Sequence, residues 1–146
     1  MNILQTIKTV VLKFPTAKVD NASLTYTTAL DTAGFHEAKI VVILGDTDIG
    51  VTALKLQESN SSDMSSATDV PECDFTGDLP TATDDNKIYS FHVDTRGRKR
   101  YLRPVVTIGD GVTGAFADVI AYLAGGSEQP DTATERGLAG ERFAKG

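Results

Sequence analysis

The sequence predicts an all-β protein, an antiparallel β-sandwich with extended N-terminal and C-terminal arms. Short apolar or alternating segments recur between residues 39 and 124, and turn-forming residues separate them. With 146 residues, 40% of them apolar, the chain suits one domain around a single core of aliphatic side chains. We therefore expect an N-terminal arm with the first strands in residues 1–35, the sandwich core in 36–124 and an extended tail in 125–146.

Two segments near the N-terminus carry apolar residues in regular patterns. In Ile3 to Phe14 the spacing fits one face of a helix, but the Thr and Val content favours a strand, so both structures remain open. Pro15 ends this segment, and Ala22 to Leu30 then alternates as an exposed strand does.

Two further strands are expected in the middle of the chain. Lys39 to Leu44 is short and β-branched, which predicts a strand buried on both faces or at the centre of a sheet. Val51 to Gln57 predicts a half-buried strand, with Leu54 and Leu56 on one face and Lys55 on the other.

The segment from Glu58 to Asp85 holds eight acidic residues and no Lys or Arg. Many Ser, Thr and Pro residues accompany them, which predicts a mobile, solvated loop with brief edge strands at most, around Val70 and Phe75.

Two alternating segments, Lys87 to Asp94 and Tyr101 to Ile108, flank an Arg96-Gly97 turn and predict a β-hairpin. Pro104 has no amide hydrogen to donate, so the second strand should lie at a sheet edge or carry a bulge at that point. Ala115 to Ala124 fits a helix or a strand, and we favour a last strand opposite Tyr101 to Ile108. The polar tail from Gly125 onward should stay extended or disordered until a partner orders it.

Charge and composition narrow the classes of function. A formal net charge of -6 and a pI near 4.8 argue against general nucleic-acid binding and favour a protein partner. The single cysteine, Cys73, permits neither an intrachain disulfide nor a cysteine zinc cluster. We see no export signal and no apolar run long enough to cross a membrane, so we expect a soluble protein made in the cytoplasm.

The predicted interaction site is a cluster of five of the fourteen basic residues: Arg96, Arg98, Lys99, Arg100 and Arg103. In an acidic chain we favour a protein partner for this cluster, such as the acidic loop of another copy. A merely solvated hairpin is the alternative, and nucleic acid is a distant third.

The segment Gly109 to Gly114 matches the G-x-G-x-x-G pattern of dinucleotide sites. Such a site needs a βαβ unit and an acidic residue on a strand about 20 residues further on. Asp131 has this spacing but falls in the polar tail, so we favour a glycine-rich turn and expect no cofactor.

We predict no catalytic residue and no metal site, and hence no enzyme. His36 and His92 have no carboxylate partner that spacing implies. The clusters Asp46 to Gly50 and Asp84 to Asn86 lack the full calcium-binding loop and are interpreted as turns.

A longer pattern is informative about function. The run Ile88 to Arg103, followed by Val105 to Thr107 and Gly109 to Ala115, resembles small structural proteins of tailed-bacteriophage virions. Leu54 to Ser59 and the Ser- and Asp-rich loop after it extend the resemblance to about residues 36–124.

This resemblance implies a jelly-roll-like sandwich that serves as a capsid decoration, or cement, protein. Such a protein would sit on the outer surface of the phage head and bind the major capsid protein, often as a homotrimer, without catalytic residues, nucleic acid or membrane. A head-fibre or tail-associated module that binds carbohydrate or a receptor is the alternative, with Tyr89, Phe91 and Tyr101 as an aromatic platform. A dinucleotide-binding enzyme is the third hypothesis.

Overall fold

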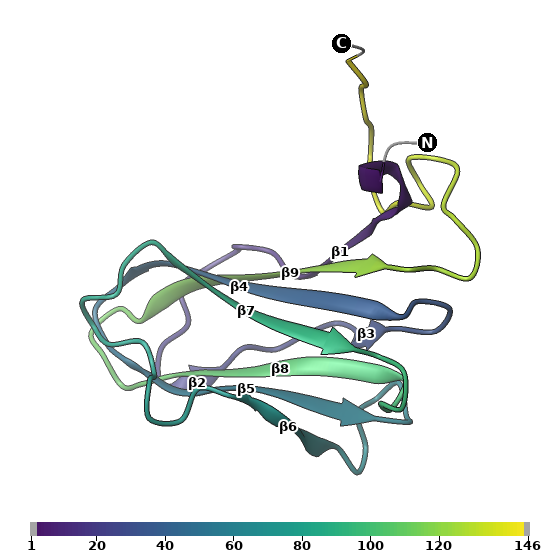
Figure 1. The fold of residues 1–146 in the computed structure, drawn as a ribbon. Coiled ribbons are helices and arrows are strands. Elements are labelled where there is room, and N and C mark those ends of the chain that lie inside the picture. Colours follow the sequence, from purple (N-terminus) through teal and green to yellow (C-terminus); the bar gives the residue numbers. More distant parts are fainter. Residues whose placement is uncertain (1–2, 145–146) are drawn as a thin grey trace.

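Two antiparallel β-sheets packed face to face make up the computed structural model, which describes residues 3–144 (Figure 1). This confirms the predicted β-sandwich. Sheet A contains four strands, in the spatial order β1 (Lys8–Lys13), β9 (Ala115–Ala124), β4 (Glu37–Thr47) and β7 (Lys87–Asp94). Sheet B contains, in order, β2 (Ala22–Ser23), β8 (Tyr101–Ile108), β5 (Val51–Ser59) and β6 (Thr68–Asp74), and β3 (Leu30–Asp31) also pairs with β8.

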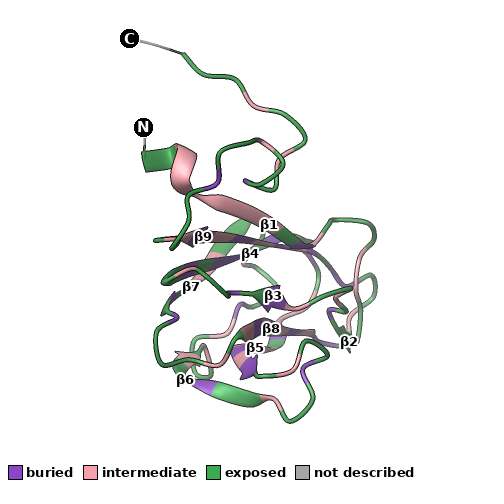
Figure 2. Cartoon of the chain, turned by 90° about the vertical axis from the view of Figure 1, so that its right-hand side faces the viewer, coloured by how far each residue is buried: buried purple, intermediate pink, exposed green. Residues whose placement is uncertain are grey.

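One core lies between the sheets, because the long strands turn aliphatic side chains inward. Figure 2 marks the buried residues along these strands in purple. Removal of a Leu or Ile side chain from water stabilises the fold by about 2 kcal/mol. The largest side chains with less than 2% of their surface exposed are Leu30, Ile40, Leu44, Leu54, Leu56, Leu102, Ile108, Leu123, Val42, Val106, Val119 and Pro104.

Most predicted strands are confirmed. β4 lies between β9 and β7, as expected of the short β-branched segment, and Leu54 and Leu56 of β5 both face the core. Ala115–Ala124 is a strand and not a helix. The ambiguous N-terminal segment divides into a 3-10 turn, η1 (Ile3–Thr6), and strand β1.

The predicted hairpin of β7 and β8 is wrong, because the two strands belong to different sheets. Residues 95–100 cross from sheet A to sheet B, a gap of about 10 Å that six residues span easily. Thr95 fixes the crossing: its amide donates to the His36 carbonyl at 2.9 Å and its hydroxyl to the Phe35 carbonyl at 2.6 Å. The last strand likewise pairs with β1 and β4 instead of β8.

The single strand expected over Ala22 to Leu30 is also wrong, since only its two ends, β2 and β3, pair with β8. Pro104 explains the break. The β2–β3 side of β8 is paired at Tyr101–Leu102 and Thr107–Ile108, and Pro104 lies between these positions without an amide hydrogen to offer. Within sheet B, β8 is therefore internal, and Pro104 occupies the one stretch where β8 has a single partner strand, β5.

The acidic segment from Glu58 to Asp85 forms the brief edge strand expected around Val70, and its loops have hydrogen bonds that the sequence did not predict. It contains the edge strand β6, whose Val70 is buried, and its carboxylates accept hydrogen bonds from backbone amides in their own turns and beyond. These pairs are Asp63 with Ser65, Asp74 with Thr76, Asp84 with Thr81, and Asp85 with Thr47, at 2.7 to 2.9 Å. The acidic residues thus cap turns as well as hydrating the surface.

Residues 125–144 form no strand or helix, and Arg136 packs this part of the tail against the rest of the chain. Arg136 is 6% exposed, its Nε donates to the Gln5 carbonyl at 2.6 Å, and its guanidinium pairs with Glu141. The Thr9 amide donates to the Arg136 carbonyl at 2.8 Å. Residues 3–7 and 127–144, here named the terminal lobe, lie together beyond the end of sheet A (Figure 1).

Candidate interaction surfaces

Two arginines of the predicted basic cluster are neutralised by carboxylates of their own chain. Arg96 donates to both oxygens of Asp94 at 2.9 and 2.7 Å, and these bonds lower the pKa of Asp94 to about 2. Arg100 donates to both oxygens of Asp31 at 2.8 Å, which lowers the pKa of that carboxyl, and it lies 5.1 Å from the Tyr101 ring centroid. A partner would therefore have to compete with Asp94 and Asp31 for these two side chains.

The remaining cations of the cluster differ from one another. Glu58, 7% exposed, accepts a hydrogen bond from the Lys99 amide at 3.1 Å and lies 3.6 Å from Arg98. The Lys99 ammonium donates to the Thr68 hydroxyl. Arg103 lies further along β8 and has no ion pair within the described part of the chain. Lys99 and Arg103 are therefore the residues of the cluster that are most available to a partner. The cluster has less unpaired positive charge than the sequence indicates.

The glycine-rich turn binds carboxylates of the protein itself. Asp48 accepts hydrogen bonds from the amides of Val112, Thr113 and Gly114 at 2.9, 2.7 and 2.9 Å. These bonds, above all that from Thr113, lower the pKa of Asp48. Asp20 accepts from the Gly111 amide at 2.8 Å. The amides that a pyrophosphate would need are thus occupied, and strand β9 follows where a dinucleotide site requires a helix.

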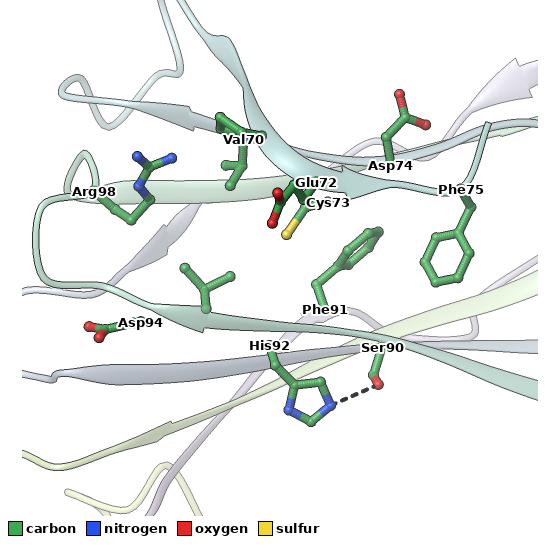
Figure 3. Close-up of a pocket in the computed structure, with 12 residues that line it drawn as sticks. Val70, Glu72, Cys73, Asp74, Phe75, Ser90, Phe91, His92, Asp94 and Arg98 are labelled. Atoms are coloured by element: carbon green, nitrogen blue, oxygen red, sulfur yellow. Dashed lines mark hydrogen bonds between the residues drawn. The ribbon is translucent and has the colours of Figure 1, made fainter.

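The two histidines do not meet. On β7 the His92 Nε2 and Ser90 Oγ atoms lie 3.2 Å apart, and both side chains point away from the cleft that Figure 3 shows. Asp94, two residues further along the same face, is held by Arg96 and does not orient the imidazole. Among residues 3–144 no group of three or more potential metal ligands comes together. No described helix has the length and apolarity that membrane crossing requires.

The cleft in Figure 3 lies between the edge strands β6 and β7 and has a volume of about 630 Å³. Burial raises the pKa of the Cys73 thiol, which keeps it protonated at neutral pH. Phe75 packs edge-on against Tyr89 and Phe91, with ring centroids 5.7 and 5.4 Å apart. Phe91 is buried and Tyr101 belongs to the other sheet, so Tyr89, Phe91 and Tyr101 do not form the aromatic platform that the alternative carbohydrate-binding hypothesis requires.

Sequence reasoning missed a surface on the outer face of sheet A. Strand register aligns Val11, Ile120 and Val41 in one row across three strands, and Ile43 and Ile88 in the next row. Phe116 follows on β9, where a β-carbon added to Gly45 would lie 3.2 Å from the Phe116 β-carbon, and the Lys18 ammonium lies 5.4 Å from the centroid of the Phe116 ring. We name this surface the outer patch; its members are Val11, Val41, Ile43, Ile88, Phe116 and Ile120.

Four of the six members of the outer patch have an exposure that is substantial for apolar residues: 67% for Ile88, 39% for Phe116, 37% for Val11 and 36% for Ile43, whereas Val41 is 8% exposed. A signal for it exists in the sequence, because β9 is apolar at outward positions as well as inward ones. Strands of that kind are expected where both faces of a sheet are covered.

No protein-family model, curated protein or solved structure matches this chain. Contiguous exposed apolar side chains on a rigid face are typical of protein–protein contact sites. The outer patch is thus the surface best suited to a protein partner.

Proposed function

We propose that this chain is a structural protein of a tailed-phage virion, a decoration protein that binds the outer surface of the head and stabilises the lattice of the major capsid protein. The observation that carries the proposal is the order of the strands, β1-β9-β4-β7 against β2-β8-β5-β6. The resemblance of residues 36–124 to small virion proteins is the second support for the proposal.

This strand order supports a jelly roll. Apart from the β5–β6 pair, the long strands alternate between the two sheets from β4 to β9, so that each sheet forms largely from strands distant in sequence. Two interlocked Greek keys produce this arrangement, and viral capsid and lectin domains use it often. A jelly-roll fold is compatible with several functions, so the choice among these functions depends on the surfaces of the protein.

The surfaces support a binding protein. The outer patch offers an apolar contact face on a rigid sheet, and the terminal lobe extends beyond the sandwich (Figure 1). Many copies of a modest contact, repeated over a capsid lattice, produce high avidity. A homotrimer would add a further level of multivalency, and the role requires no cofactor.

The proposal is tested first by whether a gene for a major capsid protein lies beside the gene for this chain, and then with heads assembled from that capsid protein. Purified chain is mixed with these heads, the heads are sedimented, and bound copies are counted. We expect saturable binding at a fixed ratio to capsid subunits and a higher melting temperature of the heads. Chain that stays in the supernatant at every concentration, or a gene neighbourhood without a capsid gene, would contradict the proposal.

A further inference from the structure

The outer patch occupies only one half of the outer face of sheet A. At the other half the outward residues are polar, with Thr9, Tyr122, Lys39 and His92 in one row. The terminal lobe begins at this polar end, where Tyr122, Ile7 and Leu138 line the same hollow. From Tyr122 to Phe116 the face extends for about 20 Å along β9, at about 3.4 Å per residue.

Asp118 lies within the outer patch. Its neighbour across the strand pair is Ile43, and Phe116 and Ile120 flank it on the same face of β9. Burial among these side chains raises the pKa of Asp118, and no Lys or Arg of the described chain forms an ion pair with it. An acidic group in apolar surroundings favours a partner that brings a cation together with apolar surface.

The tip of the terminal lobe has this chemistry. Arg142 and Phe143 are both exposed, Phe143 by 60%. The Arg142 guanidinium donates to the Glu141 carbonyl and pairs with no carboxylate of residues 3–144. Figures 1 and 2 show that the C-terminal segment extends away from the sandwich, so the tip does not contact the outer patch of its own molecule.

We propose that the tip of the terminal lobe of one copy covers the outer patch of a second copy, with Arg142 paired to Asp118 and Phe143 packed between Ile43 and Phe116. The inference deepens the proposed function and rests on it for its biological setting. The contact joins two different surfaces, so its repetition gives a closed ring where the rotation between neighbouring copies divides a full turn, and an open filament where it does not. A ring of three agrees with the trimer that the resemblance implies.

The test is a charge exchange measured on the full chain by sedimentation velocity over a concentration series. We expect the wild type to associate into trimers. Asp118→Arg and Arg142→Asp should each weaken association by about tenfold or more, because each places like charges in a desolvated contact. The double variant should restore association. Asp78→Arg is the matched control, an exposed carboxylate on a distant loop that should change nothing.

A second measurement tests the same contact without the charge substitutions, so it is valid even where those variants fail to fold. Two chains, each with Cys73→Ser, carry either Ile43→Cys or Phe143→Cys, and only one carries an affinity tag. Mild oxidation of the mixture should form a disulfide between tagged and untagged chains. The inference would be overturned by a wild type that remains monomeric, by a double variant that fails to associate, or by the absence of a disulfide between tagged and untagged chains.

These experiments use no capsid, so the two proposals fail separately. If the chain binds heads as a monomer, the inferred contact between copies is wrong and the proposed decoration function is supported. If the chain forms trimers that bind no head, the contact between copies is supported and the decoration function is wrong.

Discussion

At the scale of single residues, acidic side chains organise the loops. Asp48 connects the end of β4 to a turn more than sixty residues away in the chain, through the amides of Val112, Thr113 and Gly114. The sequence indicates that both segments are turns, because Asp and Gly cluster there. It contains no local signal that one turn supplies the acceptor for the other, since that contact exists only after the sheets have packed.

Asp48→Asn should lower the melting temperature at neutral pH, because an amide nitrogen cannot accept the backbone hydrogen bonds that the carboxylate does. The folded-state pKa of Asp48 is lowered, so its contribution is complete above the unfolded pKa of about 4 and is lost as the pH falls through the folded value. The difference in melting temperature between wild type and variant should therefore shrink below about pH 4. Thermal denaturation from pH 2 to 8 measures it.

Asp110→Asn is the matched control for this change, as an exposed carboxylate in the same turn. It should melt like the wild type at every pH. A constant difference for Asp48→Asn across the whole range would show that the carboxylate charge has no part in holding the turn.

At the scale of elements, the sequence specifies strands better than it specifies their partners. Alternation predicts β5, β7 and β8 because each strand has one buried face. The Arg96-Gly97 turn suits a hairpin and a crossing between sheets equally, and the hydrogen bonds that select the crossing come from Phe35 and His36, distant in sequence. Pairing is decided by such nonlocal contacts, and local pattern does not contain them.

Thr95→Val tests the crossing. The substitution keeps the shape of a buried side chain but leaves the Phe35 carbonyl without its donor, which should cost about 1 to 2 kcal/mol of unfolding free energy. Denaturant titration measures the loss. Thr52→Val is the control, since that hydroxyl is exposed and its bond to the Thr107 carbonyl is long, at 3.3 Å. Equal effects of both substitutions would contradict a special role for Thr95.

Gly137→Ala tests the contact between the terminal lobe and β1. Gly137 has a φ of 76°, and a β-carbon there would collide with the Thr9 carbonyl oxygen, so alanine should separate this part of the tail from the strand. We expect faster amide exchange at Thr9 and in residues 131–144, with little change in the sandwich. Gly140→Ala meets nothing within 4 Å and should exchange as the wild type does.

At the scale of the whole molecule, the fold class was predictable and the functional surface was not. Composition and alternation are enough for a sandwich, because they report which side chains must be buried. The outer patch depends on which strands become neighbours, and Val11, Ile120 and Val41 form a row only after β1, β9 and β4 pair. The basic cluster shows the converse, since its charge is obvious in the sequence and its carboxylate partners are not.

The single core predicts that both sheets unfold together. Leu56 of sheet B and Val119 of sheet A are both fully buried in one hydrophobic cluster. Leu56→Ala should cost about 3 kcal/mol and Val119→Ala about 2 kcal/mol, from lost burial and the cavity left behind. Val112→Ala, at a side chain 91% exposed, should stay within about 0.5 kcal/mol of the wild type.

Calorimetry and amide exchange distinguish a shared core from two separable layers. With a shared core, either core variant shows one transition at a lower temperature, and the slowest amides of β4 and β5 accelerate by the same factor, because each exchanges only through global unfolding. If the sheets were separable, Leu56→Ala would accelerate β5 alone and divide the melting curve into two transitions. That outcome would also weaken both proposals, because a contact face on sheet A can bind a partner tightly only if the layer beneath it is rigid.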